Sequence, residues 1–147
     1  MLPEIITGVV FLFVRNGKLL IEDRPEEDED FGSMPFIPGG KIRFRQGESA
    51  EEALIREVKE EMGRKVEVGE VIDLGDYYLI SKRGKMQHPR AFLVKDFKGD
   101  PQNVVPYKGV HRWIKIEDYD KELPLAASKL VVERALKVLS EEESLED

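Results

Sequence analysis

The chain has 147 residues, 41% hydrophobic and 36% charged, with a net charge of −7, which fits one compact α/β domain over residues 1–147. The acidic surface argues against a nucleic-acid polymer as partner, and the absence of cysteine excludes disulfides, thiolate metal sites and a cysteine nucleophile. No apolar run approaches the roughly 20 residues of a membrane helix, and residues 1–4 lack a basic secretory signal, so we expect a cytoplasmic protein with no membrane partner.

The first part of the chain predicts a hairpin followed by loops. The Asn16-Gly17 pair is a strong turn signal between two apolar runs. The acidic run Glu26–Asp30 is typical of a solvated loop. In chain order we expect a strand over Ile5–Val14, a strand over Lys18–Asp23, a loop over Pro25–Gly32, a short strand over Met34–Ile37 and a glycine-rich segment over Gly39–Gly47.

A helix is predicted between Ser49 and Gly63. Ser49 and Glu52 match the Ser-x-x-Glu capping box, and Gly63 suits a helix end. An apolar stripe is expected to be buried, formed by Leu54, Ile55, Val58 and Met62.

The second part of the chain predicts further strands and a closing helix. Arg83-Gly84-Lys85 has the composition of a turn between strands. A mixed sheet packed between helices is the expected fold. We expect one or two strands over Val66–Ile80, a strand over Met86–Phe97, a loop over Gly99–Gly109, a strand over Val110–Ile116 and a helix over Leu125–Leu139.

Three acids share one face of the first helix. Glu57, Glu60 and Glu61 are spaced i, i+3, i+4, and they lie beside the stripe that must be buried. Carboxylates crowded in this way repel each other. A hard divalent cation such as Mg²⁺ resolves that conflict, because it prefers carboxylate and water oxygens. Ala53, one turn earlier on the same face, leaves room for a ligand.

Basic residues alternate just before the helix. Lys41, Arg43 and Arg45 would point to one side of an extended segment, where they could bind the phosphates of a substrate. The alternative is that they offset the acidic loop Glu26–Asp30 or the carboxylates of the helix.

The segment from Pro38 to Gly63 resembles the signature of the Nudix hydrolase family. Glu48 is followed by seven residues and then by Arg56-Glu57-Val58-Lys59-Glu60-Glu61-Met62-Gly63, and Pro38-Gly39-Gly40 is similar to the family's usual entry. Two positions depart from the pattern. Seven residues separate Gly40 from Glu48 where the family has five, and Arg64 stands where an apolar residue is usual.

The resemblance implies an α/β/α sandwich and Mg²⁺-dependent hydrolysis, with Mn²⁺ as a second option for the metal. The substrate would be a small nucleoside diphosphate derivative: a nucleoside triphosphate, a nucleotide sugar, ADP-ribose or a dinucleotide. A homodimer is left open. The implied metal ligands are Glu57, Glu60, Glu61 and the carbonyl of Gly39. The implied catalytic residues are Glu60, Glu61 and Arg56, with Glu60 or Glu61 as general base. The resemblance also implies that Arg24, together with Lys41, Arg43 and Arg45, binds substrate, and that the structural residues are Gly40, Glu48 and Gly63, with Glu48 bracing Arg56.

Alternatives remain at three points. His111 could replace a general base that some family members carry on a later loop, or it could be structural. A catalytically silent nucleotide sensor could use the same scaffold. Isopentenyl diphosphate isomerase, which shares the fold, needs a cysteine that this chain lacks. The candidates for stacking on a nucleobase are Phe31, Phe36, Tyr77, Tyr78 and Trp113, each of which could equally be a core residue.

Overall fold

The computed structural model of the chain describes residues 5–146, so the expectation about a signal at residues 1–4 lies outside them. Within these residues no helix is both long and apolar enough to cross a bilayer. The helices are α1 (Ala50–Met62), α2 (Tyr119–Glu122) and α3 (Ala126–Glu146), with 3-10 turns η1 (Phe44–Gln46) and η2 (Ile116–Asp118). The strands are β1 (Gly8–Arg15), β2 (Lys18–Asp23), β3 (Pro35–Phe36), β4 (Gly39–Lys41), β5 (Glu67–Val68), β6 (Val71–Asp76), β7 (Leu79–Ile80), β8 (Met86–Gln87), β9 (Pro89–Val94), β10 (Phe97–Lys98) and β11 (Val110–Lys115).

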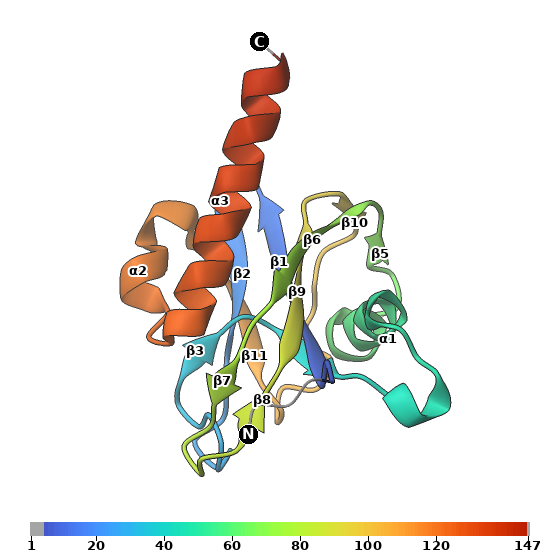
Figure 1. Cartoon of the computed structure of the whole chain (residues 1–147), viewed down its shortest axis with the longest axis vertical. Helices are drawn as coiled ribbons and strands as arrows, with labels where there is room; N and C mark the ends of the chain where they lie inside the picture. Colours follow the sequence, from blue (N-terminus) through green and yellow to red (C-terminus); the bar gives the residue numbers. More distant parts are fainter. Residues whose placement is uncertain (1–4, 147) are drawn as a thin grey trace.

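A mixed sheet lies between α1 on one face and α3 on the other (Figure 1). Its main path is β11-β2-β1-β9-β6, with β3 beside β2 and β4 beside β1. The β1–β9 pair is parallel and the remaining pairs of this sheet are antiparallel. The expected α/β/α sandwich with a mixed sheet is confirmed.

The hairpin that opens the sheet is built as predicted. Arg15 pairs with Lys18, and Asn16 and Gly17 between them have φ angles of 52° and 72°. Two successive positive φ values match a type I′ turn, whose twist suits the flanking strands. This turn sets the register of β1 against β2, and so determines which side chains of β2 face which layer.

Side chains of β1 alternate between two apolar layers. Phe11 and Phe13 join the layer that contains α1, whereas Leu12 packs with Val131 and Val132 of α3. This alternation is the period-2 geometry of a strand buried on both faces. The site described below lies on the α1 side of the sheet.

Several boundaries differ from the prediction. The region Val66–Ile80 contains three short strands rather than one or two, and α2 was not expected. The last helix continues to Glu146, so it extends beyond the sheet in Figure 1. The expectation that Ile55 is buried is wrong, since its side chain is 46% exposed. At 100° per residue, Ile55 lies beyond the edge of the stripe made by Leu54 and Val58.

The acidic loop is only partly solvated. Asp28 accepts hydrogen bonds from the backbone N–H groups of Asp30 and Phe31, which shapes the loop from within. Asp30 also pairs with Arg83 in the β7–β8 turn, and this guanidinium lowers the pKa of Asp30 to about 2. The loop is therefore fastened to a distant turn rather than left free in solvent.

Candidate active site

Helix α1 is positioned by its first turn and its buried face. Ser49 accepts a hydrogen bond from the N–H of Glu52, and the Glu52 carboxylate accepts one from the N–H of Ser49, so the predicted capping box is present. Leu54 and Val58 are buried against the sheet. Together these contacts set the rotation of the helix, which brings Glu57 against β4.

Arg56 ties the loop before α1 to the carboxylates on the helix. Its Nε and Nη2 donate to the two oxygens of Glu48 at 2.7 and 2.9 Å, and Nη2 also donates to the carbonyl of Lys41 at 2.8 Å. Its Nη1 donates to Glu57 at 2.8 Å and to Glu60 at 3.2 Å. The two hydrogen bonds that Arg56 donates to Glu48 stabilise the ionised carboxylate and lower the pKa of Glu48 to about 2.

The three helix acids line one cleft of about 600 Å³. Glu57 packs against β4: a Cβ at Gly40 would lie 2.2 Å from its carboxyl carbon, so a larger residue there would displace this carboxylate. Glu60 is 50% exposed and lies 3.7 Å from Arg43. The other lining residues come from the β4–η1 segment, from α1 and from the loop before β11: Lys41, Ile42, Arg43, Arg56, Val105 and Lys108.

Glu61 is partly buried and has a shifted pKa. Burial is the main cause that raises its pKa to about 8, and the negative charges of Glu22 and Glu57 add to this effect, while Arg24 opposes it. Its Oε2 atom is buried and has no hydrogen-bond partner within residues 5–146. An unpaired buried carboxylate oxygen beside two other acids fits the oxygen-rich donor set that Mg²⁺ prefers.

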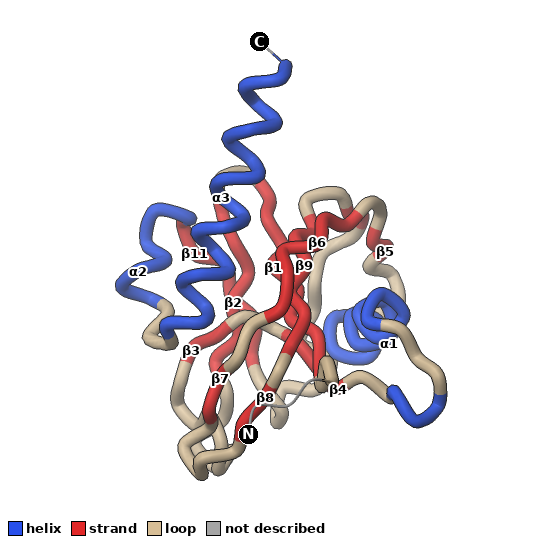
Figure 2. Tube along the Cα trace, in the orientation of Figure 1, coloured by secondary structure: helices blue, strands red, loops and turns tan. Residues whose placement is uncertain are grey.

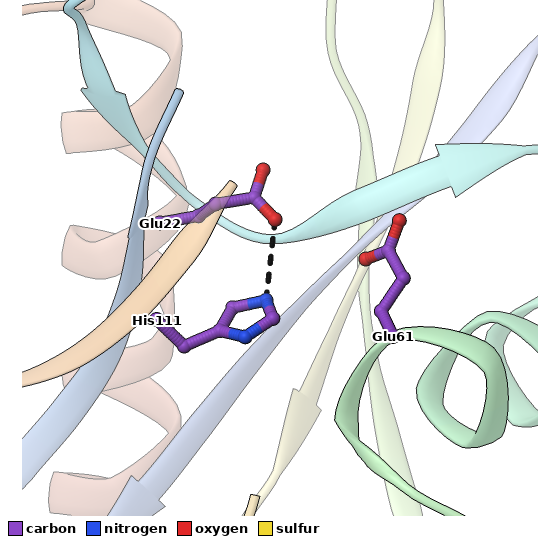
Figure 3. A group of neighbouring side chains, drawn as sticks. All are labelled: Glu22, Glu61 and His111. Carbon is purple, nitrogen blue, oxygen red and sulfur yellow. Dashed lines mark ion pairs between the residues drawn. The ribbon is translucent and has the colours of Figure 1, made fainter. Parts of the chain in front are cut away.

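A pair of side chains on neighbouring strands extends this group of acids. Glu22 of β2 and His111 of β11 are direct cross-strand partners, with Nε2 of His111 3.2 Å from Oε1 of Glu22 and both side chains 4% exposed. Glu22, Glu61 and His111 each offer a ligand atom, and these atoms lie within 4.8 Å of one another (Figure 3). Sequence reasoning missed Glu22. The only signal was an acid inside a buried strand.

The four basic residues expected to bind substrate do not act as one group. Lys41 and Arg43 line the cleft. Arg45 lies in the 3-10 turn η1, which projects away from β4 in Figure 2, and its guanidinium sits 5.9 Å from the ring centre of Phe44. The expected alternation ends at Arg43, because the chain turns there instead of remaining extended. Arg45 is not among the residues that line the cleft.

Arg24 is partly buried and is held by three contacts. Its Nε lies 2.7 Å from Oε2 of Glu22, its Nη1 lies 3.4 Å from Asp28, and its guanidinium covers the ring of Phe36 at 4.6 Å. Arg24 therefore places a positive charge beside Glu22.

The three glycines of the motif occupy tight or special positions. Gly39 and Gly40 are in β4, opposite Val10 and Val9 of β1, and a Cβ at Gly39 would lie 2.2 Å from the carbonyl oxygen of Val9. Gly63 ends α1 with a φ of 113°, a conformation that side chains disfavour. The close pairing of β4 with β1 places the start of this segment beside Glu57.

The candidate stacking residues divide into two groups. Phe36 and Tyr77 line a small apolar cavity between the sheet and α3, together with Ile37, Leu125, Ser128 and Val131. The remaining aromatic candidates pack on other rings. Phe31 stacks on Phe36 with centroids 5.3 Å apart, Tyr78 on His88 at 4.2 Å, and Trp113 on Phe97 at 6.4 Å.

Known proteins share this motif and this fold. A model of the NUDIX domain matches residues 4–135. CTP pyrophosphohydrolase of Escherichia coli (strain K12) is 34% identical over 103 residues, which cover 67% of this chain and 69% of that protein. The crystal structure of the MutT NUDIX hydrolase from Burkholderia pseudomallei superposes with a TM-score of 0.71 at 25% identity, covering 86% of this chain and 95% of that one.

The same fold also occurs in the NUDIX domain of Shewanella oneidensis NrtR, solved with ADP ribose, at a TM-score of 0.68 and 20% identity over 90% of this chain and 86% of that chain. The chain therefore belongs to the Nudix family. It is a pyrophosphohydrolase of that family, acting on nucleotide derivatives.

Proposed function

We propose that the chain hydrolyses the diphosphate linkage of a nucleoside triphosphate with the help of Mg²⁺. The observation that carries this proposal is the cleft in which Glu57, Glu60 and Glu61 meet Lys41 and Arg43. Acids that can hold a divalent cation stand beside cations that can hold phosphate oxygens. This combination suits a polyphosphate, which needs its charge neutralised before a nucleophile can approach.

Glu57 and Glu61 are the acids best placed to hold the cation, with the Gly39 carbonyl as a further candidate ligand. Glu57 is kept in position by Arg56, 2.8 Å away, and Glu61 by its burial. A bound Mg²⁺ would polarise a phosphoryl oxygen and lower the pKa of a water molecule.

Glu60 is the proposed proton acceptor, because it is half exposed and reaches the open side of the cleft. The oxygen of water forms a new bond to phosphorus while the bridging P–O bond breaks. The leaving phosphate group departs with the electron pair of that bond, and the proton of the water passes to the Glu60 carboxylate. Lys41 and Arg43 would hold the charged phosphate groups in place.

The nucleoside triphosphate is preferred over the other nucleotide derivatives because the relative at 34% identity is a CTP pyrophosphohydrolase. The apolar surface beside β3 is the candidate contact for the base, and the cavity there, about 20 Å³, would have to widen to admit it. Phe36 and Tyr77 offer ring surfaces there, and Ser128 is the buried polar residue of the lining. Ile37 at this cavity is only two residues from Gly39, so one segment connects the base and metal regions.

The direct test compares Glu61→Gln with Glu60→Gln on a panel of nucleotides in saturating Mg²⁺. Each variant should lose more than about 100-fold in kcat, because each loses a carboxylate at the reacting centre. The melting temperature of metal-free Glu61→Gln should be unchanged or higher, since the substitution removes a buried acid with an unpaired oxygen.

Near-wild-type turnover of Glu61→Gln would remove Glu61 from the mechanism. If the wild-type protein bound nucleotides in a thermal-shift assay and released no product from any of them, the chain would be a nucleotide sensor and the proposed hydrolysis would be wrong.

A further inference from the structure

Three buried side chains from three separate elements meet in one place. Glu22 comes from β2, Glu61 from α1 and His111 from β11, and Figure 3 shows the two carboxylates and the imidazole turned toward a common space. Their candidate ligand atoms lie within 4.8 Å of one another. We call these three residues the Glu–Glu–His cluster. It differs from the group of three acids on α1 because His111 offers a ring nitrogen as a candidate metal ligand.

The hydrogen bonds of His111 determine which ring nitrogen faces the cluster. Oδ1 of Asn103 accepts the backbone N–H of His111 at 2.7 Å, and the same oxygen lies 3.1 Å from Nδ1. A backbone N–H can only donate, so the Asn103 atom must be the oxygen, and Nδ1 must carry a proton. In the neutral ring, Nε2 then carries a lone pair. This atom lies 3.2 Å from Oε1 of Glu22 and can bind a cation.

The acceptor atoms of the cluster are not satisfied by the protein. Within residues 5–146, Oε2 of Glu22, Oε2 of Glu61 and Nε2 of His111 are buried without a hydrogen-bond partner. Arg24 approaches Glu22 at 2.7 Å, but its Nε also lacks a hydrogen bond, so this contact is an ion pair without hydrogen-bond geometry. Leaving such atoms unpaired is costly, and native proteins seldom do so.

A proton on Nε2 of His111 would give hydrogen-bond partners to only some of these buried atoms. It would satisfy Nε2 and one oxygen of Glu22, 3.2 Å away, and would leave the second oxygen of Glu22 and that of Glu61 unpaired. A divalent cation would take ligand atoms from all three residues at once.

The surroundings of the cluster also suit a metal site. The contact from Asn103 to the far nitrogen of His111 is the kind of support that fixes a ligating imidazole. Gly109 leaves space for Glu22, because a Cβ there would lie 2.7 Å from its carboxyl carbon.

We propose that Glu22, Glu61 and His111 form a binding site for a first-row transition-metal ion, with one nitrogen and carboxylate oxygens as ligands. The imidazole makes the site favour ions such as Co²⁺ or Zn²⁺ over Mg²⁺, which prefers oxygen alone. This metal site goes beyond the proposed hydrolysis, because binding of a transition-metal ion can be measured without any turnover of nucleotide. Glu61 would be shared between this site and the Mg²⁺ held near Glu57.

The first test is a Co²⁺ titration of the full chain, followed by visible absorption and calorimetry. Glu22→Gln and His111→Gln should each weaken Co²⁺ binding by more than about 100-fold, because removal of a direct ligand exceeds the effect of losing its supporting contact. Glu51→Gln is the control: it removes an exposed carboxylate of the same helix that lies outside both the cluster and the cleft, and it should leave the Co²⁺ spectrum unchanged. Mg²⁺ at equal concentration should not displace Co²⁺.

A second measurement uses the wild-type protein, so it does not depend on whether a variant folds. The chain has two histidines, and a Zn²⁺ titration followed by ¹⁵N NMR should shift Nε2 of His111 but not the ring nitrogens of His88. An unshifted His111 ring, or Co²⁺ binding that His111→Gln and Glu22→Gln leave intact, would overturn the proposed site. Both results are independent of whether any nucleotide is cleaved in Mg²⁺, so this proposal and the proposed function can fail separately.

Discussion

Replacing Arg56 by lysine keeps a positive charge on α1 but removes the planar fork that contacts four groups at once. The guanidinium makes two hydrogen bonds to Glu48, one to the carbonyl of Lys41 and one each to Glu57 and Glu60, at 2.7 to 3.2 Å. An ammonium group cannot reproduce the paired geometry with Glu48. The loop before the helix would lose its main connection to the metal-binding face.

The expected loss in the free energy of unfolding depends on how deeply Arg56 and Glu48 are buried. The Arg56 side chain is 18% exposed and that of Glu48 is 14% exposed, so solvent screens the interaction only partly. Two hydrogen bonds join Arg56 to Glu48, and lysine can keep one of them. Because a hydrogen bond to a charged group contributes about 1.5–3 kcal/mol, we expect the free energy of unfolding to fall by about 1.5–3 kcal/mol. For a domain of this size that corresponds to a fall in melting temperature of roughly 5–10 °C.

The assay combines urea unfolding at pH 7 with steady-state kinetics in Mg²⁺. Arg56→Lys should also lower kcat by about 10- to 100-fold, because Glu57 loses the contact that orients it. Arg45→Lys is the control, since Arg45 lies outside the cleft. A double-mutant cycle with Glu48→Gln should show strong coupling between Glu48 and Arg56. Stability within about 0.5 kcal/mol of wild type together with an unchanged kcat would refute the bracing role of Arg56.

Three further predictions test other parts of the site. Gly40→Ala should abolish Mg²⁺-dependent turnover, because the new Cβ would lie 2.2 Å from the carboxyl carbon of Glu57; retained turnover would show that this contact does not matter. Arg43→Ala should raise KM, and more so at low ionic strength, whereas Arg45→Ala should leave KM unchanged; equal effects of the two would exclude a specific phosphate contact from Arg43. The pKa of Glu48 is lowered in the folded protein from 4.5 to about 2. Its ionised carboxylate therefore stabilises the fold fully above about pH 4.5, and this stabilisation is lost as the pH falls toward 2. The difference in unfolding free energy between wild type and Glu48→Gln should therefore shrink between about pH 5 and pH 2 in urea titrations, and a constant difference would contradict this assignment.

Local patterns predicted the parts of the fold that depend on neighbours in sequence. The Asn16-Gly17 turn and the Ser49–Glu52 capping box both formed, because each is decided by residues within a few positions. The clustering of Glu57, Glu60 and Glu61 on one cleft follows from helical spacing in the same way.

Features that depend on distant segments were not predictable. The approach of Glu22 to His111 requires the register of β2 against β11, two strands that are far apart in the chain. Nothing in either segment alone specifies that pairing. The alternation expected for Lys41, Arg43 and Arg45 assumes an extended chain, and η1 interrupts it.

The central claim is that water cleaves a nucleoside triphosphate between its α- and β-phosphates in this cleft. The most direct measurement is mass spectrometry of the products formed from CTP and the other nucleoside triphosphates in ¹⁸O-labelled water with Mg²⁺. We expect a nucleoside monophosphate and pyrophosphate, with one ¹⁸O atom incorporated per turnover into one of the two products, and a rate of product formation lower by more than about 100-fold for Glu61→Gln. Release of inorganic phosphate with a nucleoside diphosphate, or no product from any nucleotide, would contradict it.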